Sequence, residues 1–230
     1  MDEKHKDIIN HLFELQMPSS GDISRISNIG SILKAARYLS GRNLETGIYE
    51  MNELTINNVL VGLIHPFQFA GVMCYLILLE QIGTIFRFIN EPSCHNNKGI
   101  ICALKKFSNL NDEKKTKSID ALRNSLTHRF GLATEKKQNK PDKSDKSDKQ
   151  YKFILSIERN KGIVKLPISP WLGDFSDKSE DTSTTIYMID FADMVEQIID
   201  KVKNEINLEN LELKLKDGVD ELYARYTCIF

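Results

Sequence analysis

Hydrophobic residues recur every three or four positions along most of residues 3–132, a spacing that is typical of amphipathic helices. The pattern predicts helices over 3–16, 22–40 and 98–108. In the second of them, Asp22 is a suitable N-terminal cap and Gly41 ends the apolar stripe. We therefore expect the first part of the chain to be a helical bundle.

A longer apolar segment, Val59–Leu79, contains no Asp, Glu, Lys or Arg and is long enough to span a bilayer. His65, Pro66 and Gln68 lie in its middle with Gly62 and Gly71 on either side, and proline discourages one continuous helix. We expect a helix or loop that ends near Ile64, followed by a buried helix over 67–90. A helix that crosses a membrane stays open as the alternative.

The next helix is predicted to begin after Asn111 or Asp112 and to be closed by Gly131. Four of its apolar residues fall within about 80° of one another at about 100° per residue. They are Ile119, Leu122, Leu126 and Phe130. We expect this face to pack in the core and the opposite face to meet solvent.

The second half of the chain has a different pattern. Residues 133–152 are rich in Lys, Asp and Ser, and we expect a solvated, disordered loop. The apolar runs 151–157 and 163–166 flank Arg159-Asn-Lys-Gly162, which predicts an antiparallel hairpin. Residues 184–189 predict a third strand.

These elements predict a mainly α protein with a small antiparallel β insertion, built of a hairpin or three strands. A last helix is expected over 191–208, with an apolar tail that docks. The expected division is a helical bundle over 1–132, the loop over 133–152, the β insertion over 153–190, and a C-terminal helix and tail over 191–230 that pack on the bundle.

Composition narrows the class of protein. The chain has 230 residues, a formal net charge of −1 and 41% hydrophobic residues, which fits a soluble globular protein. The near-neutral charge argues against a protein that coats nucleic acid by bulk electrostatics. The charged N-terminus has no apolar run behind it, so we expect no signal peptide, a cytoplasmic location and no membrane partner.

The cysteines do not predict a metal centre. Cys94-His95 and Cys102 have the residue types of metal ligands, but their spacing matches no familiar zinc site. Reduced structural cysteines are the favoured interpretation. We therefore expect neither a metal nor another cofactor.

The candidate chemistry lies near the end of the helix that Gly131 closes, in the stretch from Arg123 to His128. Arg offers a planar fork of donors that matches phosphate oxygens, and His transfers protons near neutral pH. Asn124 and His128 project at about 140° and 180° from the apolar stripe, whereas Arg123 projects near about 40° and must reach around the helix. The plain alternative is a solvated polar face that ends in a His.

Residues 121–128, Ala-Leu-Arg-Asn-Ser-Leu-Thr-His, resemble the Arg-x4–6-His motif of the HEPN superfamily, in which a polar residue often follows the Arg. HEPN domains are small helical bundles, and many are metal-independent endoribonucleases of toxin–antitoxin, abortive-infection and RNA-targeting CRISPR systems. The resemblance implies a HEPN-like bundle over about 20–132 and 191–208. One toxin subgroup has Tyr two residues after the His, where this chain has Phe130.

The resemblance also implies roles. His128 would be the general base or acid at the ribose 2′-hydroxyl or the leaving oxygen, Arg123 would bind the scissile phosphate, and Asn124 would orient either of them. Thr127 is a supporting residue, and Glu80 either pairs with Arg123 or lies at its helix edge.

Active HEPN enzymes usually join two motifs across a dimer. The resemblance therefore implies a homodimer that cleaves RNA, together with an antitoxin or a regulatory partner. The alternative is a non-catalytic HEPN-like module that binds a nucleotide or a protein.

Overall fold

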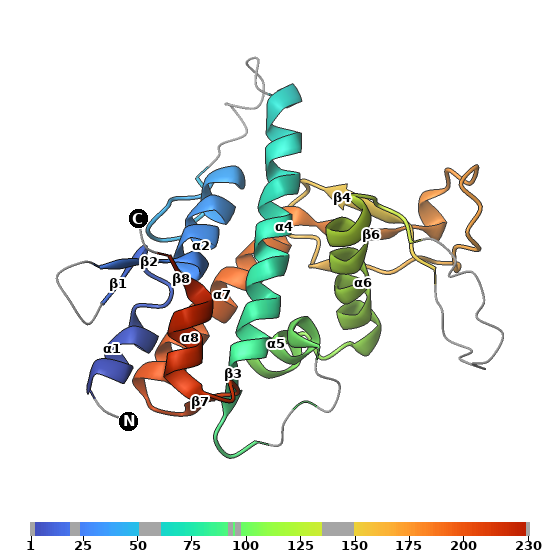
Figure 1. Cartoon of the computed structure of the whole chain (residues 1–230). Coiled ribbons are helices and arrows are strands. Elements are labelled where there is room, and N and C mark those ends of the chain that lie inside the picture. The colour runs from blue at the N-terminus through green and yellow to red at the C-terminus, as the bar shows by residue number, and fades with distance from the viewer. Residues whose placement is uncertain are drawn as a thin grey trace. The chain divides into compact units, whose positions relative to one another are not determined.

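The computed structural model describes residues 3–18, 24–50, 61–91, 94, 98–134 and 150–228. Within them lie seven α-helices and several very short strands, so the prediction of a mainly α protein is confirmed (Figure 1). The chain forms two compact units. Unit 1 comprises 1–111 and 192–230, and unit 2 comprises 112–191.

Unit 1 is built mostly of helices. They are α1 (Glu3–Asn10), α2 (Asn28–Leu39), α4 (Val61–Ile85), α5 (Gly99–Phe107), α8 (Gly218–Tyr226) and the part of α7 (Met188–Asn207) that follows Phe191. Two small antiparallel sheets join distant parts of the chain. One consists of β1 (Gln16–Met17), β2 (Arg25–Ser27) and β8 (Thr227–Cys228), and the other of β3 (Phe86–Phe88) and β7 (Leu211–Leu213).

Helix α4 forms the core of unit 1, and both α2 and α5 pack against it. Its backbone comes very close to that of α5 at Gly83. A Cβ atom added to Gly83 would lie only 1.8 Å from the carbonyl oxygen of Gly99, so no larger residue fits there without a shift. Among the described residues, one helical segment, Gln68–Ile85, has the length and composition to cross a membrane. Of this segment, 56% is buried, as expected for a core helix.

Helix α4 differs from the sequence prediction at both ends. It starts at Val61 and continues through Pro66, so the expected break is absent. It ends at Ile85, because the next three residues pair with β7 as a strand. Neither the proline effect nor the apolar pattern takes account of a strand partner more than a hundred residues away.

The first two helices are shorter than predicted. Helix α1 ends at Asn10. The N-terminal cap of α2 is Ser27, whose hydroxyl accepts a hydrogen bond from the Gly30 amide at 3.1 Å and donates one to the Leu12 carbonyl. The predicted cap, Asp22, lies outside the described residues. Strand β2 occupies Arg25–Ser27 because β1 and β8 pair with it on either side, so α2 begins only at Asn28.

Unit 2 contains one long helix and one sheet. Its elements are α6 (Glu113–Arg129), β4 (Phe153–Ser156), β5 (Val164–Lys165), the 3-10 helix η2 (Glu180–Thr182) and β6 (Thr184–Tyr187). Strand β6 is central, with β4 parallel on one side and β5 antiparallel on the other.

The predicted hairpin is therefore wrong, since β6 separates β4 from β5. The turn that was expected to join them is held by another partner. The carboxylate of Asp190 accepts hydrogen bonds from the backbone amides of Asn160, Lys161 and Gly162, at 3.0, 2.9 and 3.0 Å. Because Asp190 follows β6, this turn is fixed to the chain after the central strand.

The ends of the expected loop 133–152 are paired rather than disordered. Ala133 and Lys152 form an antiparallel bridge, and the Thr134 amide donates to the Tyr151 carbonyl at 2.8 Å. Residues 135–149 lie outside the described residues. The composition of the segment gave no signal for this backbone pairing.

The division into units differs from the one expected from sequence. Helix α6 belongs with residues 150–191 rather than with the N-terminal helices. The Ser125 hydroxyl near the C-terminal end of α6 donates to the carbonyls of Gly131 and Ala133 at 2.7 and 3.1 Å. These contacts hold the end of the helix to the segment whose Ala133 pairs with Lys152.

Candidate functional site

Helix α6 has one fully buried face. The side chains of Ile119, Leu122 and Leu126 are 0% exposed, as the apolar stripe predicted. Asp112 caps the helix, and its carboxylate accepts the Lys114 amide at 2.8 Å. Phe130 departs from the prediction, because it is 74% exposed.

Phe130, and not Gly131, is the residue that ends α6. It adopts a left-handed conformation with a φ of 50°, and its amide bonds the Leu126 carbonyl at 3.1 Å. A left-handed residue turns the chain away from the helix axis. The Phe130 ring therefore leaves the apolar face to which the helical period assigned it.

The other side of α6 carries Asn124 and His128, and Arg123 lies beside the buried face. Arg123 Nη1 donates a hydrogen bond to Asn124 Oδ1 at 2.9 Å, so the guanidinium reaches toward the polar face. His128 is exposed one turn after Asn124. Thr127 donates its hydroxyl to the Arg123 carbonyl at 2.7 Å, which is a local helix contact.

This arrangement brings a guanidinium, a carboxamide and an imidazole to the end of one helix. Because Asn124 Oδ1 accepts from Arg123, its NH₂ group points its donors elsewhere. Glu80 is half-buried on α4 in unit 1, and its pairing with Arg123 stays a prediction.

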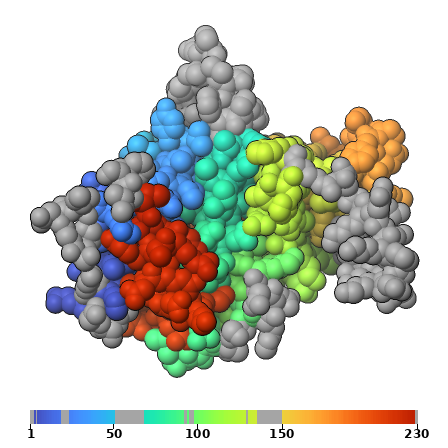
Figure 2. All heavy atoms as spheres, viewed as in Figure 1, coloured from blue at the N-terminus to red at the C-terminus, as the bar shows by residue number. Residues whose placement is uncertain are grey.

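Asn124 and His128 belong to a longer row of residues that we call the α6 polar stripe. Its members are Lys114, Lys117, Ala121, Asn124 and His128. They fall within about 80° of one another on a helix with about 100° per residue. None of them is buried. Figure 2 shows that one side of α6 forms part of the molecular surface in that view.

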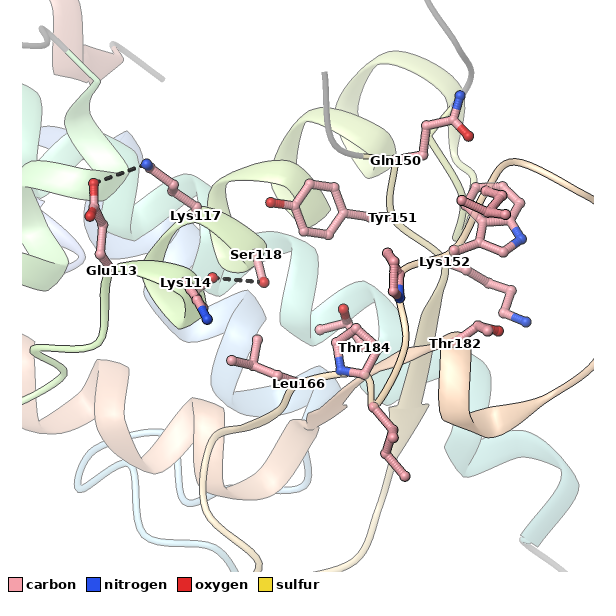
Figure 3. A pocket seen from close by; sticks show the side chains of 15 residues that line it. Glu113, Lys114, Lys117, Ser118, Gln150, Tyr151, Lys152, Leu166, Thr182 and Thr184 are labelled. Carbon is pink, nitrogen blue, oxygen red and sulfur yellow. Dashed lines mark hydrogen bonds and ion pairs between the residues drawn. The ribbon is translucent and has the colours of Figure 1, made fainter. Parts of the chain in front are cut away.

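A cavity of about 710 Å³ lies within unit 2 at the first half of α6. Four segments line it: the first turns of α6, residues 150–152, residues 166–172, and Thr182 with Thr184. Figure 3 shows Lys114 and Lys117 on the helical side of the cavity, and Lys152 with Thr182 on the strand side. The hydrophobic pattern gave no sign of this cavity, because it is assembled from segments that are distant in sequence.

The three lysines of the cavity differ in their contacts. Lys152 donates to the carbonyls of Asp177 and Ser179 at 3.0 and 2.9 Å and pairs with the Asp177 carboxylate at 3.3 Å, so its role is structural. Lys117 pairs with Glu113 one turn earlier at 2.9 Å, and both side chains are more than half exposed. Lys114 is exposed and makes no ion pair with a described residue.

The wall of the cavity combines apolar and polar groups. Ile168 and Leu172 are 79% and 86% exposed at the cavity lining, and the indole of Trp171 is 4% exposed with its N–H bonded to the Asp174 carbonyl. Gln150 Oε1 is buried and accepts no hydrogen bond from the described part of the chain. Since this oxygen lies against Gly173, the cavity offers a ligand mainly apolar surface and a cationic edge.

Unit 1 contains a second cluster of polar side chains, and it is structural. Arg37 forms two hydrogen bonds with Glu196, from Nε to Oε1 at 3.0 Å and from Nη2 to Oε2 at 2.8 Å. Its Nη1 donates to the carbonyls of Leu44 and Glu45, and the Tyr75 hydroxyl donates to Glu196 at 2.7 Å. Burial by itself lowers the pKa of Arg37, but the bonded charge of Glu196 outweighs it and leaves that pKa raised. The hydrogen bonds of these groups are made with one another and with backbone carbonyls, so the cluster holds α2, α4 and α7 together.

Within the described residues, no group of three or more His, Cys, Asp or Glu side chains is placed to hold a metal ion. His95, which the sequence put beside Cys94, lies outside those residues. The chain matches no known family model, no curated protein and no solved structure.

Proposed function

We propose that this protein is a HEPN-like, metal-independent endoribonuclease. One observation carries the proposal: Arg123 donates a hydrogen bond to Asn124, which lies on the polar side of α6, and His128 is exposed one turn after Asn124. The buried apolar face of the same helix holds these residues on a rigid element, which favours a precise geometry. The motif of residues 121–128 supports the family assignment.

The reaction is an internal displacement at phosphorus. The ribose 2′-oxygen forms a bond to phosphorus while the bond from phosphorus to the 5′-oxygen breaks, which leaves a 2′,3′-cyclic phosphate and a 5′-hydroxyl. His128 takes the proton from the 2′-hydroxyl or gives one to the leaving oxygen. Arg123 stabilises the charge that develops on the phosphate, and Asn124 holds the guanidinium in place.

A homodimer completes the proposed site. One copy supplies a single imidazole, whereas the displacement is helped by both a base and an acid. Two α6 helices related by a two-fold axis would bring together two His128 side chains and two Arg123 side chains. Cytoplasmic RNA is the proposed substrate, and an antitoxin or regulatory protein is the proposed control on a toxin or antiphage effector.

The proposal is tested by RNA cleavage in the presence of EDTA. We expect the wild-type protein to cut RNA and to leave cyclic phosphate ends. His128→Ala and Arg123→Ala should each lower the rate roughly a hundredfold or more. His11→Ala, which changes an exposed histidine in unit 1, is the matched control and should cut normally. Full activity in both motif variants, with folding intact, would sink the nuclease proposal.

The second candidate is a non-catalytic HEPN-like module that binds a nucleotide or a protein. The cavity of unit 2 favours it, since its volume is within the ordinary range of ligand sites. The same assay separates the two candidates. Binding of RNA without any EDTA-resistant cleavage supports the module, whereas product with cyclic phosphate ends supports the enzyme.

A further inference from the structure

We propose that the cavity of unit 2 is a nucleotide subsite, which holds one base and its phosphate of a single-stranded RNA. The identification of the bound strand as a substrate rests on the nuclease function proposed above. The subsite itself rests on the cavity, the α6 polar stripe and the residues of the cavity wall.

Two cationic side chains lie where the cavity meets α6. Lys114 and Lys117 line the cavity and also begin the α6 polar stripe, which continues to Asn124 and His128. Asn124 lies seven positions after Lys117, which corresponds to about 10 Å along the axis at about 1.5 Å per residue. A strand that follows this stripe would meet the two lysines at the cavity and then Asn124, which the Arg123 guanidinium contacts.

Both lysines are available to bind a phosphate. The pair between Lys117 and Glu113 is exposed on both sides, and such pairs contribute little to stability. A phosphate can replace the Glu113 carboxylate at small cost. Lys114 has no ion pair among the described residues, so it adds a further charge at the same edge.

The size of the cavity and the chemistry of its wall suit a nucleotide. A volume of about 710 Å³ is ample for one nucleotide. Ile168 and Leu172 present apolar surface at the lining, and planar bases pack well on apolar and aromatic surfaces. The hydroxyls of Thr182 and Thr184 add polar groups to the same lining.

An RNA strand fits these features better than an acidic peptide does. The two lysines begin a line on α6 that leads to Asn124, to which Arg123 donates a hydrogen bond, and then to His128, and phosphates recur along a strand in the same way. A peptide carboxylate would explain the lysines but not the continuation to Arg123 and His128. An acidic peptide is therefore included below as a competitor.

Trp171 provides the probe, because it is the only tryptophan of the chain and lines the cavity. The full-length His128→Ala variant would be titrated with a single-stranded RNA oligonucleotide, with adenosine 5′-monophosphate and with polyglutamate. We expect the oligonucleotide to change the Trp171 fluorescence and to bind at least tenfold more tightly than the mononucleotide, because the stripe adds contacts. Equal binding of the mononucleotide would reassign the cavity to a free nucleotide and overturn the strand proposal.

Two substitutions separate phosphate contacts from base contacts. Lys114→Ala with Lys117→Ala should lower the slope of log affinity against log salt by about 1.4, or about 0.7 for each lost phosphate contact with a single strand. Leu172→Ser should weaken binding about tenfold with the slope unchanged, since Leu172 offers apolar surface only. Lys165→Ala, an exposed lysine on β5 outside the cavity lining, should change neither quantity.

The outcomes are distinguishable from those of the nuclease test. If the double lysine variant binds with the affinity and salt slope of Lys165→Ala, the subsite is wrong even when RNA is cleaved. If the subsite behaves as expected but the wild-type protein cuts no RNA, the nuclease proposal fails alone. If polyglutamate competes as well as the oligonucleotide, the cavity is a peptide site.

Discussion

Glu196 gives the sharpest test of how unit 1 is held together. The substitution Glu196→Ala removes the carboxylate that Arg37 contacts through two hydrogen bonds and that Tyr75 contacts through a third. Side-chain exposure in the pair is 4% for Arg37 and 9% for Glu196. Truncation therefore leaves a buried guanidinium without its counter-charge.

The expected loss of stability is large because Arg37 stays buried and charged after its partner carboxylate is removed. Removing one member of a buried ion pair destabilises a protein by about 3–5 kcal/mol. For a unit of this size, such a loss lowers the Tm by roughly 10 °C. Two carbonyls, of Leu44 and Glu45, still accept from Arg37 in the variant, which places the expected value nearer to 3 kcal/mol.

Urea unfolding followed by far-ultraviolet circular dichroism measures the effect, because most helices belong to unit 1. Gln197→Ala is the matched control, since it truncates the next residue of α7 at an exposed position. The double variant Arg37→Met with Glu196→Leu should recover most of the loss, because apolar residues of similar volume can replace a buried ion pair.

If the free energy of unfolding of Glu196→Ala is within about 1 kcal/mol of that of Gln197→Ala, the ion pair does not stabilise unit 1 as described. That result would mean that water or another acceptor reaches Arg37 in the folded state. A double variant that is less stable than Glu196→Ala alone would show that the unpaired charge of Arg37 is not the source of the destabilisation.

Further predictions concern other parts of the chain. Deleting Lys136–Asp148 should leave the Tm nearly unchanged and cause at most a modest, salt-dependent loss of RNA affinity, measured by thermal melting and by titration. The Thr182 hydroxyl and the Ser179 amide hold the pKa of Asp177 below its ordinary value, so this carboxylate stabilises unit 2 above that value and the contribution is lost as the pH falls through the lowered pKa. Thr182→Val should raise this pKa in an NMR titration. Gly83→Ala should destabilise unit 1 in urea, because the new methyl group meets the backbone of α5, and an undiminished unfolding midpoint would contradict that close approach. Mixing His128→Ala with wild-type subunits should lower the RNA cleavage rate more than dilution does, whereas a fully active monomer in sedimentation would exclude the dimer.

Local signals predicted local structure well. The helix expected over 98–108 is present as Gly99–Phe107, and Asp112 caps α6 as expected. The buried face of α6 also agrees with its apolar period up to Leu126. These features depend on residues within a few positions of one another, which is the range that spacing and capping rules describe.

Long-range pairing accounts for what the sequence did not predict. Strand β6 enters between β4 and β5, and β3 forms because β7 returns to it. The burial of Arg37 depends on a carboxylate 159 positions later, and the cavity depends on four separated segments. No periodicity along the chain encodes such partners, so the polar positions of Asn124 and His128 were predicted from the sequence but the cavity at the start of α6 was not.

The order of the two units along the chain has a consequence for biosynthesis. Unit 2 is continuous over 112–191, whereas unit 1 needs residues from both sides of it. Until residue 196 has left the ribosome, Arg37 has no counter-charge, and the sheet that contains β2 also lacks its last strand, β8. We expect unit 2 to be able to fold first although it is made later than most of unit 1. On this view, the part that carries the proposed ribonuclease residues becomes structured before the rest of its own chain.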